Sequence, residues 1–403
     1  MTNLVDTESA LNRRVVITGC GVVCSLGRTS SEVWEAVENN LSGVKLISQF
    51  DTSKYKTKIA AEIDDIESLG HRFKQEYWDG LDKTAQFVVS AGLSAFEDAS
   101  LNFTPQNSSE VAVVIASQWQ ERNSTYQPAE TLAGLLGVTG KVLQVNPHAA
   151  GGIVAISEAA EMIRRGDALV ALAGGVENPI TPETLSFYEE RDDLSVNNAS
   201  PTKASRPLDL NRDGFVIAEG AAIVVLEDLE VAQVRGANIL AELEGSSYVF
   251  SPGMSGIPKI STSQIAKSIL SAVDKSGRIR SEIDVVYMNA SGSLEEDALE
   301  AKGIQSVFGA ATRHHMYTPA LKGHTGNMFS ASGPLGVIVL TEAMQRGKIP
   351  STLNLVDDDP EIDLDANKIS VKDDIISVCI VNAIDGPNNA TLVISHPRVM
   401  RDF

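Results

Sequence analysis

Cysteine, basic residues and long apolar runs are all scarce in this sequence of 403 residues. Cys20, Cys24 and Cys379 are an odd number and have no second metal-ligand pair beside them, so we expect buried reduced thiols. Lys and Arg total 33 against 53 Asp and Glu, and the formal net charge of -20 argues against binding to nucleic acid or anionic lipid. No run of about twenty apolar residues occurs and the N-terminus has no apolar signal core, which predicts a cytoplasmic protein without membrane association.

What the sequence does contain is an alternation of short apolar segments with amphipathic ones. After a polar tail over residues 1–12, β-branched runs such as EVAVVIAS predict buried strands, and stretches such as GIVAISEAAEMIRRGD predict helices. This alternation indicates an α/β fold whose sheets are covered by helices on both faces. It occurs twice, over 13–250 and 251–403, and no Pro/Gly/Ser-rich linker separates the two halves, so we expect one compact body.

The most informative local signal is the stretch QVNPHAAGGIVAISEAAEMIRRGDALVALAGGVE at residues 144–177. It predicts a strand end, a glycine-containing turn, an amphipathic helix and a second buried strand. Such a turn places a residue at a helix N-terminus, where the helix dipole and free N–H groups favour a thiolate or an oxyanion. A nucleophile would be expected at this turn.

Four ordered segments resemble the β-ketoacyl synthases of fatty-acid and polyketide assembly. PHAAGG at 147–152 aligns with that family's TACASG-like hexad, and SRPLDLNRDGFVIAEGAAIVVLE at 205–227 with its SRPFD-RDGFV-GEGA block. GHTGNMFSASG at 323–333 resembles its GH-GAAG block, and STLNL at 351–355 resembles its PT-NL segment. The resemblance implies a thiolase-like α/β fold of five layers, αβαβα, with two pseudo-duplicated halves, and usually a dimer.

The same resemblance assigns catalytic roles to four positions. At two of these, the nucleophile and the first histidine, this sequence has residues that cannot perform the role. In the family a cysteine attacks an acyl thioester, while two histidines and a lysine assist decarboxylation of malonyl-carrier protein and the condensation that follows. The nucleophile position here is Ala149, which has no group that can form a thioester. The first histidine position, eight residues before Asp297, is Asn289, which cannot shuttle protons near neutral pH.

The remaining catalytic positions fall around the GHTG sequence. His324 matches the second histidine, and Pro319 stands where the family has a lysine, five residues earlier; Lys322 is nearby but in another register. The family's GFGG-like gate, which moves a phenylalanine, corresponds to NAIDGPNNA at 382–390 and contains no aromatic residue. We therefore expect no intact catalytic set, with His324 either structural or a remnant that supports decarboxylation.

The connection between Ser117 and Ala149 is shorter than the family's, in which it lines the acyl tunnel and the dimer interface. Trp119 and Tyr126 lie in this connection and are candidates to shape the tunnel, although ordinary core or interface packing explains them as well. His148 is a further tunnel or interface candidate, and we do not expect it to act as a base.

Other charged clusters have structural interpretations. Arg212, Asp213 and Glu219 in the RDGFVIAEG block are expected to brace the fold through ion pairs. The acidic run 357–359 is expected to be a solvated loop, and the histidine pair 314–315 has no carboxylate or cysteine ligands at a recognisable spacing. We expect neither a metal nor a cofactor.

Taken together, the resemblance and its departures predict a chain length factor of a bacterial type II polyketide system. Such a subunit would pair with a catalytic ketosynthase as a heterodimer and shape the tunnel that limits chain length. Acyl carrier proteins are typically acidic, as this chain is, so they would dock mainly through the partner. Two alternatives stay open, namely a decarboxylase that makes an acetyl starter from malonyl-carrier protein and a homodimeric binding protein for acyl thioesters.

Overall fold

The structure is a computed structural model that describes residues 13–119, 124–253, 257–309, 316–364, 366–372 and 376–400. The expected tail over 1–12 and the pair His314–His315 lie outside these residues. Nine strands form one mixed sheet in the order β5-β4-β6-β7-β1-β8-β13-β12-β9. They are β1 (Val15–Val23), β4 (Val111–Ala116), β5 (Val142–Val145), β6 (Val170–Glu177), β7 (Gly220–Asp228), β8 (Ala241–Phe250), β9 (Val285–Tyr287), β12 (Val378–Asp385) and β13 (Asn388–Ser395). Two short hairpins pair β2 (Lys45–Leu46) with β3 (Ile59–Ala60) and β10 (Lys348–Ile349) with β11 (Val371–Lys372).

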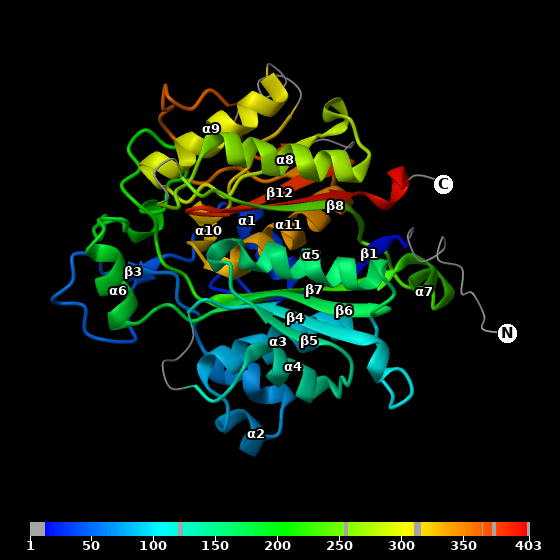
Figure 1. Ribbon diagram of the computed structural model, residues 1–403. Coiled ribbons are helices and arrows are strands. Elements are labelled where there is room, and N and C mark those ends of the chain that lie inside the picture. Colours follow the sequence, from blue (N-terminus) through cyan, green and yellow to red (C-terminus); the bar gives the residue numbers. More distant parts are fainter. Residues whose placement is uncertain are drawn as a thin grey trace.

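Helices divide the sheet into two sections and complete five layers (Figure 1). The central layer holds α5 (Gly151–Arg164) and α11 (Ser332–Arg346), which contact strands of both sections. On the outer faces, α3 (Lys83–Asp98) and α4 (Pro128–Leu136) cover the first section and α8 (Thr262–Ser276) and α9 (Leu294–Phe308) lie over the second. The other helices are α1 (Ser30–Glu38), α2 (Gln75–Asp79), α6 (Pro182–Glu189), α7 (Leu229–Val234) and α10 (Lys322–Thr325). The expected five-layer α/β arrangement is therefore present.

Continuous apolar strands explain why the sheet lies inside the molecule. Every residue of β1, β4, β6 and β7 is buried, and β4 pairs in parallel with both β5 and β6. Strands covered on both faces need no polar alternation, so β4 is an unbroken apolar run and the other three are mostly apolar. On the outer face, α3 begins at Asp82, whose carboxylate accepts the N–H of Ala85 at 2.8 Å and caps the helix.

The two sections are joined where β1 meets β8. Val15 to Ile17 of β1 pair with Ala241 to Leu243 of β8, and β8 continues along β13 over most of its length. β8 therefore belongs to the sheet section of the later half, although its residues fall within the expected first half, 13–250.

The cysteines were expected to be buried reduced thiols, and the charges of the RDGFVIAEG block were expected to form bracing ion pairs. All three cysteines are buried and free, and burial raises the pKa of the Cys24 thiol to about 11. Arg212 is buried and donates to Asp359 at 2.7 Å, so it braces the fold with a residue of the acidic run rather than with its own block. That run is only partly solvated, because Asp359 is buried.

Glu219 is the second bracing charge, and it too has its partner outside the block. Its buried carboxylate accepts from Lys83 at 2.7 Å and from the N–H of Ile63 at 2.9 Å. Asp213 is exposed. Within the described residues, no helix is long and apolar enough to cross a membrane, and no group of three potential metal ligands occurs.

Candidate functional site

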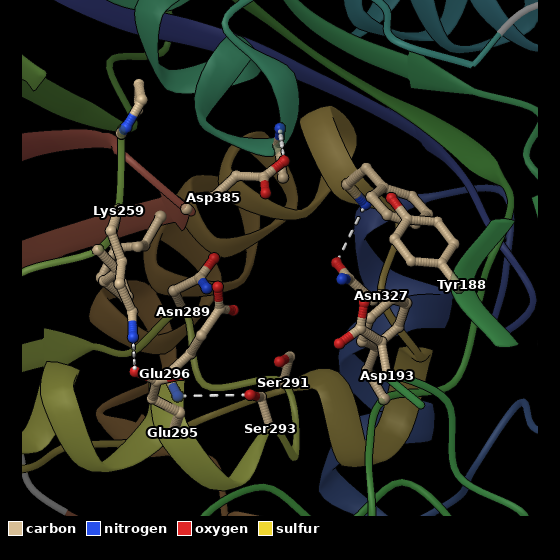
Figure 2. Close-up of a pocket in the computed structure, with 17 residues that line it drawn as sticks. Tyr188, Asp193, Lys259, Asn289, Ser291, Ser293, Glu295, Glu296, Asn327 and Asp385 are labelled. Atoms are coloured by element: carbon tan, nitrogen blue, oxygen red, sulfur yellow. Dashed lines mark hydrogen bonds and ion pairs between the residues drawn. The ribbon is translucent and has the colours of Figure 1, made fainter. Parts of the chain in front are cut away.

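A pocket of about 290 Å³ opens at the start of the central helix α5, between the two halves of the molecule (Figure 2). Ala149 lies at its base, directly before α5, and Asp385 reaches it from the end of β12. Asn289 and Ser291 follow β9, and Glu296 belongs to the first turn of α9. The remaining lining residues are Tyr188, Asp193, Phe215, Pro258, Lys259, Ile260, Ser293, Glu295, Asn327, Phe329, Ile384 and Gly386.

The turn before α5 is held in place by close backbone packing. A Cβ atom at Gly152 would lie 2.0 Å from the carbonyl oxygen of Ser330, so only glycine fits where the helix start approaches that segment. Ala149 is 5% exposed, and its backbone N–H donates to Asp385 Oδ2 at 2.9 Å. The position expected to hold a nucleophile therefore offers a methyl group to the pocket, and this group cannot attack a thioester.

Asn289 and Lys322 form a hydrogen-bonded pair in the wall of the site. Both are buried, and Lys322 Nζ donates to Asn289 Oδ1 at 3.0 Å. Glu300 accepts the backbone N–H groups of Asn289 and Ala290 at 2.8 and 2.9 Å, which fixes this loop. Burial lowers the pKa of Lys322 to about 8 and raises that of Glu300 to about 7. Lys322, which was expected near the site but in another register, therefore contacts Asn289 of the pocket lining.

Pro319 and His324 lie elsewhere. Pro319 is buried beside β9, and its carbonyl oxygen accepts the N–H of Met288 at 2.9 Å. The ring of His324 lies between two carbonyl oxygens, with Nδ1 2.9 Å from that of Leu41 and Nε2 3.2 Å from that of Ser351. Burial lowers the pKa of His324. Of the four positions expected to form the vestigial site, the structure brings Ala149 and Asn289 to the pocket and does not bring the other two.

Asn327 lines the pocket and was not singled out from the sequence. Its Oδ1 accepts the N–H of Phe329 at 3.2 Å. It follows Gly326 directly and lies five residues after Lys322, the same spacing that the family motif has between its lysine and its second histidine. That spacing was the signal that could have identified both residues.

An aromatic cluster of five rings packs beside Ala149. Trp119 lies 5.8 Å from Tyr188 and 6.3 Å from Phe329, and Tyr188 stacks on Phe329 at 5.7 Å between ring centroids. Phe215 and Phe187 complete the cluster through edge-to-face contacts with Tyr188 at 5.1 and 5.0 Å. Tyr188, Phe215 and Phe329 line the pocket, so Trp119 stands in the layer behind them.

The other two tunnel or interface candidates are not part of this cluster. Tyr126 donates its hydroxyl to the carbonyl oxygen of Gly80 at 2.6 Å and packs against the core that α3 and α4 cover. His148 is exposed and has a φ of +55°, a left-handed conformation that tightens the turn before α5. Its side chain does not line the pocket.

Carboxyl groups give the pocket an acidic character. Asp193, Glu295, Glu296 and Asp385 line it, against one cation among the described lining residues, Lys259. Burial, followed by the nearby Asp385, raises the pKa of Glu296 to about 7. No histidine or cysteine is among the described lining residues. The described lining of the pocket therefore offers neither a thiol that could form a thioester nor a histidine base.

Comparisons with known proteins agree with this architecture. Sequence models of the beta-ketoacyl synthase N-terminal and C-terminal domains match residues 12–232 and 240–356. The chain is 31% identical over 399 residues to the actinorhodin polyketide putative beta-ketoacyl synthase 1 of Streptomyces coelicolor, covering 90% of this chain and 84% of that protein. It is 32% identical over 419 residues to the 3-oxoacyl-acyl-carrier-protein synthase 2 of Coxiella burnetii, covering 95% and 98%.

A solved structure described as the ishigamide ketosynthase/chain length factor superposes with a TM-score of 0.85 at 26% identity. The match covers 95% of this chain and 99% of that one. A beta-ketoacyl synthase from Burkholderia phymatum superposes with a TM-score of 0.87 at 24% identity, covering 96% and 100%, which shows the shared fold. The thiolase-like fold expected from the sequence is confirmed.

Proposed function

Because the chain belongs to the β-ketoacyl synthase family, we propose that it is the non-condensing partner of a catalytic ketosynthase in a type II polyketide system, acting as a chain length factor. The observation that carries the proposal is Ala149 at the start of α5, where a condensing enzyme of this fold needs its nucleophile. The chain keeps the scaffold of the family while its pocket has lost the group that forms the acyl-enzyme bond.

The asparagines in the pocket support the same proposal. We infer that Lys322 and Asn327 occupy the positions of the family's lysine and second histidine, since they have its spacing of five residues. Asn327 lines the pocket, and Lys322 donates to Asn289 in the pocket lining. Asn289 and Asn327 then replace both histidines. An asparagine can orient an oxygen by hydrogen bonding, but it cannot accept and return a proton near neutral pH, so both proton-transfer roles are absent.

One edge of the sheet has the features of an interface for a homologous partner. β5 lies at the end of the sheet and pairs with β4 alone among the described strands. Val142 and Leu143 on β5 are each 38% exposed. An unpaired edge strand with exposed apolar side chains can be covered by an edge strand of another subunit, which would continue the sheet.

The aromatic cluster supports a role in limiting chain length. Trp119, Tyr188 and Phe329 fill the space beside Ala149 with rings in mutual contact. Closely packed rings yield little to a growing chain, so a tunnel that ends against them would stop elongation by steric contact.

The test of this function is co-expression with a catalytic ketosynthase encoded beside the chain, followed by size-exclusion chromatography and native mass measurement. We expect a one-to-one heterodimer, and we expect V142D/L143D to prevent its formation. Val234→Asp is the matched control, because Val234 is 90% exposed on α7, far along the sheet order from β5. A chain that stays homodimeric or monomeric beside its neighbouring ketosynthase would contradict the proposal.

The pocket gives little support to a malonyl-carrier-protein decarboxylase. The malonyl group carries a carboxylate, and the one cation among the described lining residues, Lys259, already pairs with Glu295 at 2.6 Å. His324, the histidine that the sequence offered for this chemistry, has both ring nitrogens against backbone carbonyl oxygens outside the pocket. We expect no acetyl-carrier protein above background when the purified chain is incubated with malonyl-carrier protein.

A further inference from the structure

The backbone N–H of Ala149 is the group in this pocket best placed to stabilise an oxyanion. It belongs to the turn that leads into α5, a helix of 14 residues, and it faces the pocket rather than an intrahelical carbonyl oxygen. N–H groups at helix starts have no intrahelical acceptor and lie at the positive end of the helix dipole. In acyl transfer, a donor of this kind holds the negative oxygen of the tetrahedral intermediate.

That donor is already occupied by a carboxylate of the same chain. Asp385 Oδ2 accepts the Ala149 N–H at 2.9 Å, and Figure 2 shows the carboxyl group of Asp385 directed at the start of α5. We infer that Asp385 acts as a built-in plug of the oxyanion position, so that the pocket rejects acyl thioesters through this carboxylate as well as through the missing nucleophile.

The backbone around Asp385 keeps the plug in place. Asp385 is the last residue of β12 and pairs with Asn388 across the turn to β13. Upstream, β12 pairs with β13 on one side and with β9 on the other, so the strand that carries Asp385 is held along both edges. The segment 382–390, expected to replace the family's aromatic gate, therefore contributes a carboxylate to the pocket.

The charges that face Asp385 come from several elements. Lys322 of α10 and the exposed His148 favour its ionised form, whereas Glu296 of α9 and Asp193 after α6 are carboxyl groups electrostatically linked to it. Burial raises the pKa of Asp385, and the hydrogen bond from Ala149 opposes this rise. In either protonation state an oxygen of Asp385 remains on the N–H group.

The inference rests on the proposed function, in which this pocket forms no acyl-enzyme bond. It adds a second cause of that loss, the occupied N–H donor, to the missing nucleophile. Restoring the thiol through Ala149→Cys would then leave the oxyanion donor blocked. Loss of one such donor lowers acyl-transfer rates by about 10²–10³-fold in hydrolases, which sets the scale of the expected effect.

The experiment gives the pocket a nucleophile and then removes the plug. A149C, A149C/D385A and A149C/D385N are incubated with a hexanoyl N-acetylcysteamine thioester, and the acyl adduct is followed by intact mass. The introduced thiolate attacks the carbonyl carbon and forms the new C–S bond. The bond to the N-acetylcysteamine sulfur breaks, and that thiolate leaves and takes a proton from water.

We expect A149C/D385A to acylate at least about tenfold faster than A149C, because its oxyanion donor is free. A149C/D385N should stay slow, since the asparagine oxygen can remain on the N–H group. A149C/D213A is the control, because it removes an exposed carboxyl that does not line the pocket, and it should acylate like A149C. Equal acylation of A149C and A149C/D385A would overturn the inference.

A second readout separates the thiolate fraction from the oxyanion donor. The pH midpoint for alkylation of the introduced thiol by iodoacetamide measures the thiolate fraction of each variant, and the acylation rates above are compared per thiolate. A difference between A149C and A149C/D385A that disappears on this scale would also overturn the inference. Failure of the proposed function is distinguished by the co-expression assay, which uses the unmodified chain and no thiol at position 149.

Discussion

The aromatic cluster gives a prediction in which stability and function can be measured on one variant, Trp119→Ala. Trp119 makes edge-to-face contacts with Phe187, Tyr188 and Phe329 at centroid distances of 5.6, 5.8 and 6.3 Å. Each such pair contributes about 0.5–1.5 kcal/mol beyond area burial, and removal of a buried tryptophan costs about 3–5 kcal/mol. Because the indole is only partly buried, we expect the free energy of unfolding to fall by about 3 kcal/mol, at the low end of that range.

Urea unfolding of the wild type, W119A and W119F measures this change. W119F keeps a ring in the cluster and should lose less than half as much as W119A. Tyr126→Phe is the matched control from the same connection, because it removes only the hydrogen bond to Gly80, worth about 1 kcal/mol. In the heterodimer, W119A should also shift the products toward longer chains. A loss below about 1 kcal/mol in W119A, with unchanged products, would refute the proposed role of the cluster.

The remaining predictions concern buried charges. Lys322→Met should lower the free energy of unfolding by about 3 kcal/mol at pH 7.5, because it leaves Glu296 and Glu300 without their cation. The loss should be smaller at pH 5, where both carboxyls are protonated. An equal loss at the two pH values in urea titrations would contradict this prediction. The folded state raises the pKa of Glu300 from its usual 4.5 to about 7, so it binds the proton more tightly than the unfolded chain does, and this residue's contribution to stability falls as pH rises through that window. The fall should reach up to about 3 kcal/mol and be absent in E300Q, and a wild-type pH profile parallel to that of E300Q would refute it. Arg212→Leu should cost about 3–5 kcal/mol by leaving Asp359 buried without its partner, and a loss below about 1 kcal/mol in the same titration would show that the pair is not a brace.

The fold was predictable because its signals are local and repeated. β4 is an unbroken apolar run and β1, β6 and β7 are mostly apolar, and burial on both faces is what such runs indicate. The turn before α5 was also predictable, because a glycine-containing segment followed by an amphipathic stretch indicates the start of a helix. Ala149 itself was identified through the resemblance of residues 147–152 to the family's hexad, and the structure places it at the pocket.

The far side of the pocket was harder to predict, because short motifs fix a register weakly. The dipeptide Gly323-His324 matches the family's histidine motif letter for letter, yet the chain turns through α10, and the residue that lines the pocket is Asn327, three residues after His324. The spacing of five residues from Lys322 to Asn327 carried the better information. Because the histidine of the motif is replaced by Asn327, the sequence offered no histidine to match at that position, and His324 was assigned to it instead.

The role of Asp385 could not be read from the sequence. The hydrogen bond from Ala149 to Asp385 joins residues 236 positions apart and depends on how β12 ends beside the start of α5. Likewise, the sequence indicated ion pairing for Arg212 and Glu219 but not their partners, Asp359 and Lys83. Such contacts arise when distant elements pack together, and no local pattern encodes them.

The most direct test of the central claim is the product made by the neighbouring ketosynthase, with malonyl-carrier protein as extender, in the presence and absence of this chain. We predict that the ketosynthase alone makes no full-length polyketide, that adding the unmodified chain with Ala149 restores it, and that this chain alone condenses nothing. Condensation by this chain alone, or an identical product from the ketosynthase without it, would contradict the account.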